Sequence, residues 1–302
     1  MASWQAHVAS WLVRLRLKRR LAATRDVEVI RRLFTPPPFK VPRDVRITPA
    51  QIGGVRGEWV EKAGPGAPVL LFLHGGGYIA CSSVTHRPIT VFYAQQGFRV
   101  FAPDYRLAPE HPFPAAVDDA VAVWRALLVS GVPRAVVSGE SAGGGLCLSL
   151  MLALRDAGLP LPAAAALFSP WTDLTCSGDS IRTNHRRCAM LTGPGMLLAA
   201  GDYLASSDPR NPIASPLFAD LTGLPPILLH VGSNEVLLDD STRLADRARA
   251  AGVPADLRIF PVVAHAWQLT PALVPEARES LAAASAFLHS ALVPAGQRGA
   301  AR

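Results

Sequence analysis

Long hydrophobic runs are missing from this chain of 302 residues. No apolar run reaches the roughly 18 to 20 residues that are needed to span a bilayer. The N-terminal stretch SWLVRLRLKRRLAATR contains too much Arg and Lys for the core of a signal peptide, and its charges follow the apolar residues. We therefore expect a cytoplasmic protein with no stable membrane insertion.

Cysteine is also scarce. The four cysteines are far apart in the sequence, none belongs to a CxxC pair, and no histidine lies at zinc-ligand spacing from them. This pattern favours ordinary thiols over a disulfide framework or a metal site. We expect no bound metal and four unpaired cysteines: Cys81, Cys147, Cys176 and Cys188.

Acidic residues are outnumbered, with 23 Asp and Glu against 30 Lys and Arg and a net charge of +7. Such an excess can indicate a nucleic-acid partner. The basic residues are concentrated in the first 46 positions and otherwise scattered, and no nucleic-acid-binding motif is present. We interpret them as an Arg-rich surface and expect no nucleic-acid partner.

Apolar residues, by contrast, make up half of the chain and suffice for a sizeable core. From about residue 68, short apolar runs alternate with longer segments in which apolar residues recur every three or four positions. Several runs are apolar throughout, as in parallel strands buried on both faces. The alternation predicts an α/β fold with a doubly wound, mostly parallel sheet. The predicted strands are 68–74, 98–104, 134–140, 163–170, 225–233 and 256–262, and the predicted helices are 115–131, 142–158, 239–252 and 275–292.

Two segments interrupt this alternation. Residues 1–45 are helical in pattern and basic, and the pattern breaks at TPPPFKVP, so we expect an N-terminal cap segment there. Residues 46–302 would form the main domain. Within it, residues 175–220 carry polar residues, Gly and Pro around a short helix, GPGMLLAAGDYLA. We expect this insertion to cover the ligand end of the sheet.

The sequence Gly139-Glu140-Ser141-Ala142-Gly143 fits the pattern G-x-S-x-G at a predicted strand-to-helix junction. A turn this tight requires small flanking residues and exposes the serine hydroxyl above the sheet. The helix that begins at Ala142 directs the positive end of its dipole to the same place. The motif predicts a nucleophilic serine, although three fixed residues also occur together by chance.

Residues His74-Gly75-Gly76-Gly77 follow the first of the predicted parallel strands. Three glycines can form a simple flexible turn, or they can expose backbone N–H groups toward one point as an oxyanion hole. Because a G-x-S-x-G motif follows downstream, we interpret them as an oxyanion hole.

A serine nucleophile needs a base, and the base needs an acid to orient it. With the chain order Ser, acid, His, the candidate base is His265, just after the last predicted strand. His230 lies inside an apolar strand, His185 in the expected cap insertion and His289 on the terminal helix.

The loop after ILLHVG offers three candidate acids, Glu235, Asp239 and Asp240. Glu235 is nearest to the strand end, where a catalytic acid is expected. Asp239 and Asp240 are placed as the N-cap and first turn of the next helix. We therefore predict Glu235 as the acid.

Further segments extend the pattern: PDYRLAPEHPFPAA at 103–116, SPWTDLT at 169–175 and the histidine near the C-terminus. Together with HGGG and GESAGG they resemble the hormone-sensitive-lipase family of esterases, also called bacterial family IV or the GDXG family. The resemblance runs over nearly the whole chain from about residue 35. It implies an α/β-hydrolase fold with a helical cap and hydrolysis of carboxylic esters without a cofactor.

The resemblance also assigns residues. Glu235 is the first residue of the family's D/E-x-L-x-D pattern, which implies that it is the acid. The oxyanion donors would be the backbone N–H groups of Gly76, Gly77 and Ala142. The chain departs from the family at Glu140, where Asp is commoner, and we expect Glu140 to support the turn and not to take part in the chemistry. It also departs at Asn234, where many relatives carry a second acid, and at NHRRCAML in the cap, which therefore says little about the substrate.

The sequence thus predicts a carboxylesterase for small esters with short to medium acyl chains, acting through an acyl-enzyme on Ser141 with His265 and Glu235. A lactonase would use the same residues. A ligand-binding receptor on an inactive scaffold, like the plant gibberellin receptors that resemble this family, would lack the catalytic histidine, which is retained here. We leave a homodimer open. Candidate pocket walls are Tyr78, Met190, Tyr203 and Trp267.

The N-terminal helix has two interpretations. Trp4, Trp11, Leu12 and Leu15 beside several basic residues could bind a membrane or oil interface. Alternatively, the helix packs its apolar side into the cap and shows its basic side to water. We favour the second interpretation.

Overall fold

An eight-stranded sheet forms the centre of the computed structural model, which describes residues 2–36, 39–62, 64, 66–132 and 134–293. The strands lie in the order β1-β2-β4-β3-β5-β6-β7-β8. The first two pairings, β1 with β2 and β2 with β4, are antiparallel, and all the others are parallel. The strands are β1 (Arg46–Ile52), β2 (Val55–Glu61), β3 (Val69–Leu73), β4 (Arg99–Pro103), β5 (Ala135–Glu140), β6 (Ala165–Phe168), β7 (Ile227–Gly232) and β8 (Ala255–Phe260).

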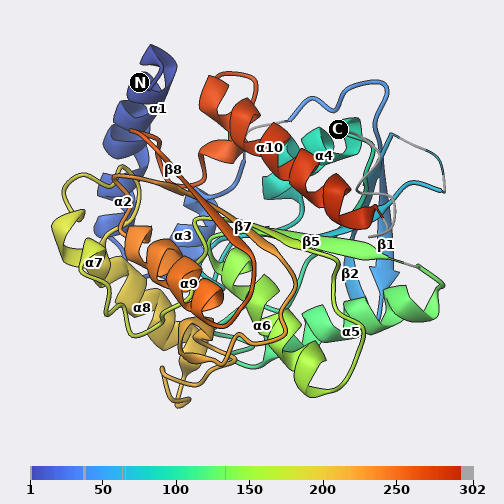
Figure 1. Ribbon diagram of the computed structural model, residues 1–302. Helices are drawn as coiled ribbons and strands as arrows, with labels where there is room; N and C mark the ends of the chain where they lie inside the picture. Colours follow the sequence, from blue (N-terminus) through green and yellow to red (C-terminus); the bar gives the residue numbers. More distant parts are fainter. Residues whose placement is uncertain (1, 37–38, 63, 65, 133, 294–302) are drawn as a thin grey trace.

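Helices cover both faces of this sheet (Figure 1). One face carries α4 (Arg87–Gln95) and α10 (Pro275–Leu292). The other carries α5 (Ala115–Val129), α6 (Ala142–Asp156) and α9 (Leu238–Ala250). Each face has its own hydrophobic core, because strands buried on both sides direct alternate side chains to opposite faces. The predicted doubly wound α/β fold, with its six strands and four helices, is confirmed.

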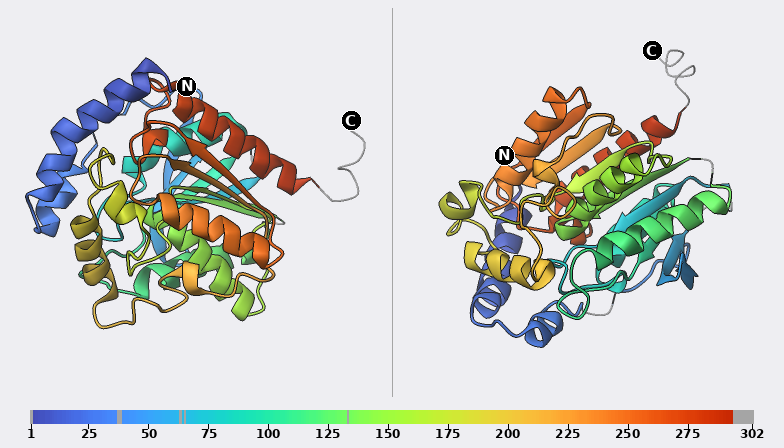
Figure 2. Two further views of the ribbon diagram at one scale, coloured as in Figure 1. Left: turned by 60° about the vertical axis from the view of Figure 1, so that its left-hand side comes forward. Right: turned by 90° about the horizontal axis from the view of Figure 1, so that it is seen from below.

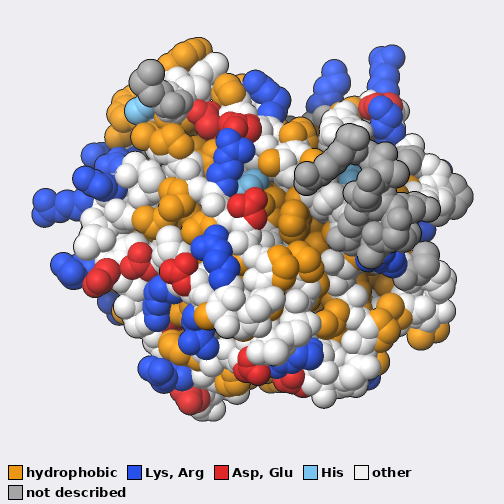
Figure 3. All heavy atoms as spheres, viewed as in Figure 1, with side chains coloured by type: hydrophobic (Ala, Val, Ile, Leu, Met, Phe, Trp, Pro, Cys, Tyr) orange, Lys and Arg blue, Asp and Glu red, His pale blue; other side chains and the backbone are white. Residues whose placement is uncertain are grey.

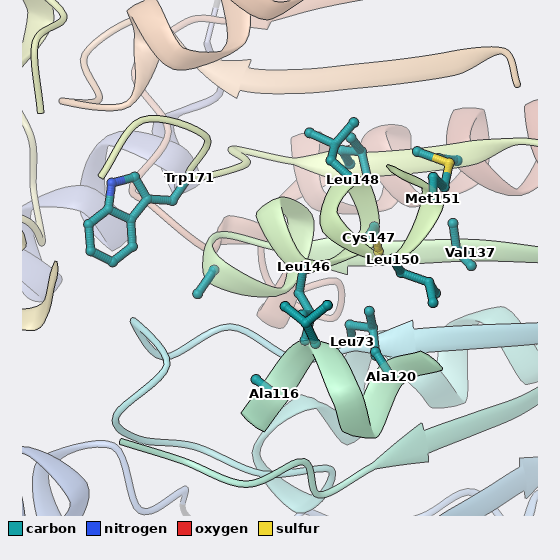
Figure 4. Packing of buried hydrophobic residues seen from close by; sticks show 14 of the residues in the cluster. Leu73, Ala116, Ala120, Val137, Leu146, Cys147, Leu148, Leu150, Met151 and Trp171 are labelled. Atoms are coloured by element: carbon teal, nitrogen blue, oxygen red, sulfur yellow. The ribbon is translucent and has the colours of Figure 1, made fainter. Parts of the chain in front are cut away.

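Helix α6 is the most deeply buried helix on its face. Figure 4 shows Leu146 pointing toward Ala116 of α5, while Leu73 and Val137 come from the strands beneath. Nearly every residue of α6 is inaccessible to solvent. The first turn of this helix, which follows Ser141, is therefore held rigidly by packing on several sides.

The sequence pattern missed the hairpin β1–β2 and helix α4. Strand β1 is mostly exposed and contains Pro49, so it lacks the apolar signal of the central strands. The hairpin turns at Gly53 and Gly54, both with positive φ (+59° and +82°), as a two-residue hairpin turn requires. The Gly-Gly pair between the two segments was the signal that could have identified the hairpin.

The N-terminal segment is helical, as expected. It comprises α1 (Trp4–Val13), the π-helical turn η1 (Arg14–Lys18), α2 (Arg19–Ala22) and α3 (Val27–Leu33). The expected insertion contains α7 (Ser180–Thr183) and α8 (Gly193–Leu204). Short 3-10 turns complete the described elements: η2 (Val84–His86), η3 (Pro216–Phe218) and η4 (Trp267–Leu269).

The N-terminal helices lie beside the α7–α8 segment in both views of Figure 2. Hydrogen bonds join the two: Arg14 Nη2 donates to Arg187 O at 2.6 Å, and Lys18 Nζ donates to His185 O at 2.6 Å and to Cys188 O at 2.8 Å. We propose that the two segments act together as the cap. The domain boundaries at 45/46, 175 and 220 stay predictions, and two prolines of the expected break, Pro37 and Pro38, lie outside the described residues.

All four cysteines are free. Within the ranges that the structure describes, no helix is both long and apolar enough to cross a bilayer.

Candidate active site

Ser141 lies at the sharp turn between β5 and α6, with φ 54° and ψ −120°. This backbone conformation is sparsely populated for a residue with a side chain. The neighbouring glycines are required by space: a Cβ on Gly139 would lie 2.3 Å from Gly143 O, and a Cβ on Gly143 would lie 2.0 Å from Leu73 O. The turn therefore has the strained geometry that the G-x-S-x-G motif predicts.

The glycine loop after β3 faces the same site. Gly76 and Gly77 have φ values of +117° and +65°, and a Cβ on Gly76 would lie 2.1 Å from Ala80 O. Ala142 is the first residue of α6, so its N–H has no partner within the helix. Both glycines border the cavity that contains the Ser141 side chain. This arrangement suits three backbone donors for a developing oxyanion.

His74, the first residue of HGGG, holds this loop from behind. Its buried ring stacks on Tyr105 with the ring centroids 4.1 Å apart, and the Tyr105 hydroxyl donates to His74 O at 2.7 Å. His74 Nδ1 lies 2.8 Å from Gly75 O. His74 therefore positions the backbone of the loop and is not part of the cavity wall.

The candidate base and acid are in direct contact. His265 Nδ1 lies 2.5 Å from Glu235 Oε2, and both side chains are buried. The other carboxylate oxygen, Oε1, accepts hydrogen bonds from Ser169 Oγ and from Gly232 N, both at 2.7 Å. Two donors thus fix the orientation of the carboxylate that orients the imidazole.

The other two candidate acids have structural partners. Asp239 Oδ2 accepts a hydrogen bond from Ser180 N at 2.8 Å, and Asp240 Oδ2 accepts from the backbone N–H of Thr172 at 2.7 Å. Both aspartates lie in the first turn of α9, but Leu237 occupies the N-cap position. The expectation that an aspartate caps α9 is therefore wrong. These carboxylates instead connect α9 to other segments.

Glu140, expected only to support the turn, also lies against the base. Its Oε1 atom is 3.0 Å from His265 Nε2, and its Oε2 atom is 3.3 Å from His86 Nε2. The first contact is close enough for an ion pair but not aligned for a hydrogen bond, and no described residue donates to Oε1. Gly75 must lack a side chain here, because a Cβ would lie 2.0 Å from Glu140 Oε2.

These contacts shift the charges of the site. Burial disfavours a charged His265, but the carboxylates of Glu140 and Glu235 outweigh this and raise the pKa of His265 well above its usual value. Burial likewise disfavours a charged Glu140, yet His265 and His86 lower the pKa of Glu140 to about 2. Two carboxylates thus face the imidazole, Glu235 at Nδ1 and Glu140 at Nε2, and both favour its protonated form. None of the described residues forms a hydrogen bond with Ser141 Oγ.

A largely apolar cavity of about 910 Å³ opens above these groups. Its base includes Ser141, His265 and Glu140. Its walls come from the N-terminal segment, from α8 and from the loop after η4. Representative wall residues are Leu17, Leu21, Phe34, Met190, Met196 and Leu273.

Of the four predicted wall residues, only Met190 borders this cavity. Tyr78 and Tyr203 stack on each other behind the wall, with their ring centroids 3.8 Å apart, so placing them in the wall was wrong. Trp267 was also misplaced: it packs against Phe260 in a separate small core. Its indole N–H donates to Glu276 O of α10 at 3.4 Å, and its ring shares this core with Val274 and Ala277.

His230 is a core residue, as expected. It is buried on β7 with Nδ1 2.8 Å from Ser280 Oγ, and burial lowers its pKa to about 3. In the described part of the chain, no three His, Cys, Asp or Glu side chains are grouped so that they could hold a metal ion.

The candidate nucleophile, acid and base follow one another in this order at the carboxyl ends of parallel strands, with the serine on a strand-to-helix turn. Fold and site together define an α/β-hydrolase. Comparison with known proteins agrees: residues 70–269 match the family described as alpha/beta hydrolase fold.

An acetyl-hydrolase of Streptomyces hygroscopicus is 43% identical over 276 residues, which cover 90% of this chain and 89% of that protein. Among solved structures, an esterase from the bacterial hormone-sensitive lipase family has a TM-score of 0.89 and 39% identity, covering 97% of this chain and 100% of that one. The esterase EstE5, soaked with p-nitrophenyl butyrate, has a TM-score of 0.91 and 38% identity over 96% of this chain and 99% of that one. The chain belongs to the hormone-sensitive-lipase-like family of carboxylic ester hydrolases.

Proposed function

We propose that the protein is a carboxylesterase that hydrolyses esters of short to medium acyl chains through the triad Ser141, His265 and Glu235. The observation that carries this proposal is the buried His265–Glu235 pair, because His265 borders the same cavity as the strained serine and the glycine loop. The names of two relatives support the acyl range: one is an acetyl-hydrolase, and the other was soaked with a butyrate ester.

The proposed reaction begins when His265 is neutral. Ser141 Oγ attacks the ester carbonyl carbon while His265 Nε2 takes the hydroxyl proton. The carbonyl oxygen becomes an oxyanion, stabilised by the backbone N–H groups of Gly76, Gly77 and Ala142. His265 then gives its proton to the departing alcohol, which leaves an acyl group on Ser141. Water then attacks the carbonyl carbon of this acyl-enzyme with His265 again as the base. The carboxylic acid product is released, and Ser141 regains its proton from His265.

The electrostatics of the site favour the charge that appears during each step. Glu235 faces Nδ1 of His265 and stabilises the imidazolium that forms when the serine loses its proton. Both of its oxygens have fixed partners, so little reorganisation is needed.

Covalent labelling tests the nucleophile. We expect an organophosphonate to label the wild-type protein once and to leave Ser141→Ala unlabelled, with kcat reduced by a factor on the order of 10³ or more. The matched control is Ser207→Ala, a substitution of a serine outside the cavity. Labelling that persists in Ser141→Ala would mean that another residue is the nucleophile.

The acyl range is tested with p-nitrophenyl esters from acetate to palmitate in detergent-free solution. We expect faster turnover of butyrate than of palmitate, and the reverse order would refute the proposed range. A lactonase would use the same residues, so lactones belong in the same screen. A cytoplasmic location also stays a prediction, which cell fractionation would test. The sequence left a homodimer open, and light scattering would decide the oligomeric state.

A further inference from the structure

The outward face of the N-terminal helix carries large apolar side chains in water. Trp4, Val8, Trp11 and Leu15 recur at the spacing of one helical face. They are 71%, 45%, 59% and 37% exposed. Figure 3 shows hydrophobic side chains gathered over α1 at the top of the molecule. The favoured interpretation of this helix, with its apolar side packed into the cap, is therefore wrong for this face, which we call the tryptophan stripe.

The opposite face of α1 is fixed to the body of the protein. Ala6 is buried in the small core around Trp267. Ser3 donates from both its N and Oγ atoms to the carboxylate of Glu276, at 2.6 and 2.8 Å, and Ser10 Oγ donates to Val262 O at 3.0 Å. These contacts prevent the helix from rotating. The described residues therefore leave the tryptophan stripe exposed, and a partner is needed to cover it.

The stripe lies in a strongly positive environment. The first 25 residues contain six Lys and Arg and no Asp or Glu. Arg16, Arg19 and Arg20 are exposed, and no ion pair in the described part of the chain neutralises them. Positive side chains beside an apolar helical face with two tryptophans are typical of helices that lie in a lipid interface. Tryptophan in particular favours the boundary between headgroups and acyl chains.

The positive charge of these arginines also indicates which kind of partner covers the stripe. In a dimer formed through this helix, two clusters of arginine would approach each other, and like charges would oppose the contact. An anionic surface would instead attract these arginines. The same continuous helix contributes Leu17 and Leu21 to the wall of the cavity. A surface that binds the stripe would therefore lie close to one wall of the cavity.

We propose that the tryptophan stripe and its flanking arginines bind the protein reversibly to membranes that contain anionic lipid, with α1 lying in the plane of the interface. This is peripheral binding by one helical face. It is separate from the proposed esterase reaction, since it needs none of the residues of the candidate active site.

Vesicle flotation tests the proposal with the full-length protein. We expect binding to vesicles of phosphatidylcholine with 30% phosphatidylglycerol, weak binding to pure phosphatidylcholine, and loss of binding as salt rises. Trp4→Ser with Trp11→Ser should lower the partition coefficient at least tenfold. Arg16→Gln with Arg19→Gln should lower it about fivefold per removed charge on anionic vesicles only.

The matched control is Val129→Ser with Arg125→Gln on α5, which removes an exposed apolar and an exposed basic side chain at the other side of the molecule (Figure 1). All variants should keep the wild-type melting temperature and hydrolyse soluble p-nitrophenyl butyrate normally. Absent binding by the wild-type protein, or equal binding by the tryptophan variant, would overturn the proposal. A wild-type dimer that becomes a monomer in the tryptophan variant would also overturn it, because a second copy would then cover the stripe.

Discussion

Replacing Glu235 with Gln should change which nitrogen of His265 carries the proton. Ser169 Oγ and Gly232 N both donate to Oε1 of Glu235, each at 2.7 Å. In the Glu235→Gln variant the amide carbonyl oxygen must take this position, because an amide NH₂ group cannot accept these bonds. The NH₂ group then faces His265 Nδ1, where Glu235 Oε2 now lies at 2.5 Å.

A donor at this position makes Nδ1 of His265 an acceptor, so the ring proton moves to Nε2. An imidazole protonated at Nε2 cannot take the proton of Ser141. The analogous wrong tautomer in serine hydrolases reduces kcat by a factor of about 10⁴. At about 1.36 kcal/mol for each factor of ten, this corresponds to about 5 kcal/mol in the activation barrier. Because glutamine has nearly the same shape as glutamate, the melting temperature of the variant should change little.

Asp239→Asn is the matched control. Asp239 accepts one backbone hydrogen bond, from Ser180 N at 2.8 Å, and an asparagine oxygen can accept the same bond. We expect kcat within about twofold of wild type and a loss of stability below about 1 kcal/mol. Both variants should be purified together, and kcat on p-nitrophenyl butyrate and the melting temperature measured for each. Normal activity in Glu235→Gln, with an inactive but stable Asp239→Asn, would refute the assignment of the acid.

Three further predictions follow from the geometry. Because the pKa of His265 is raised and only neutral His265 can act as base, the acid limb of the kcat/KM profile should lie above the ordinary histidine value of about 6.5. Glu140→Gln removes one of the two carboxylates that face His265 and should move the acid limb to lower pH. An acid limb at the same or a higher pH would contradict the effect of Glu140 on the pKa of His265. Gly76→Ala, whose Cβ would lie 2.1 Å from Ala80 O, should nearly abolish kcat in a protein that still folds by circular dichroism, and normal activity would show that the loop is not required. Met190→Ala should change the ratio of butyrate to octanoate turnover, whereas Trp267→Phe should lower the melting temperature at a constant ratio; the opposite pattern would contradict their placement.

Local patterns in the sequence determined the elements of the central fold. The runs that became β3 to β7 are buried along almost their whole length, and a parallel strand covered on both faces needs an apolar composition wherever it lies in the sheet. The residues of the G-x-S-x-G turn were also predictable, because the steric demand of a turn with a positive φ at Ser141 acts on its immediate neighbours. Glu235 was predicted as the acid from its short distance along the chain from the end of its strand, and the structure places it in contact with His265.

Contacts between distant segments were decided by the tertiary structure alone. Glu140 ends the strand that positions Ser141, but the direction of its carboxylate depends on His86 and His265, which lie far away along the chain on either side. Trp267 follows His265 by two residues, yet it packs into a core with α1 and α10. The exposure of Trp4 and Trp11 could not be read from their apolar character, because an amphipathic pattern shows which residues share a face and not what covers it. Which side of the helix is buried was decided by the bonds of Ser3 and Ser10 to residues near the other end of the chain.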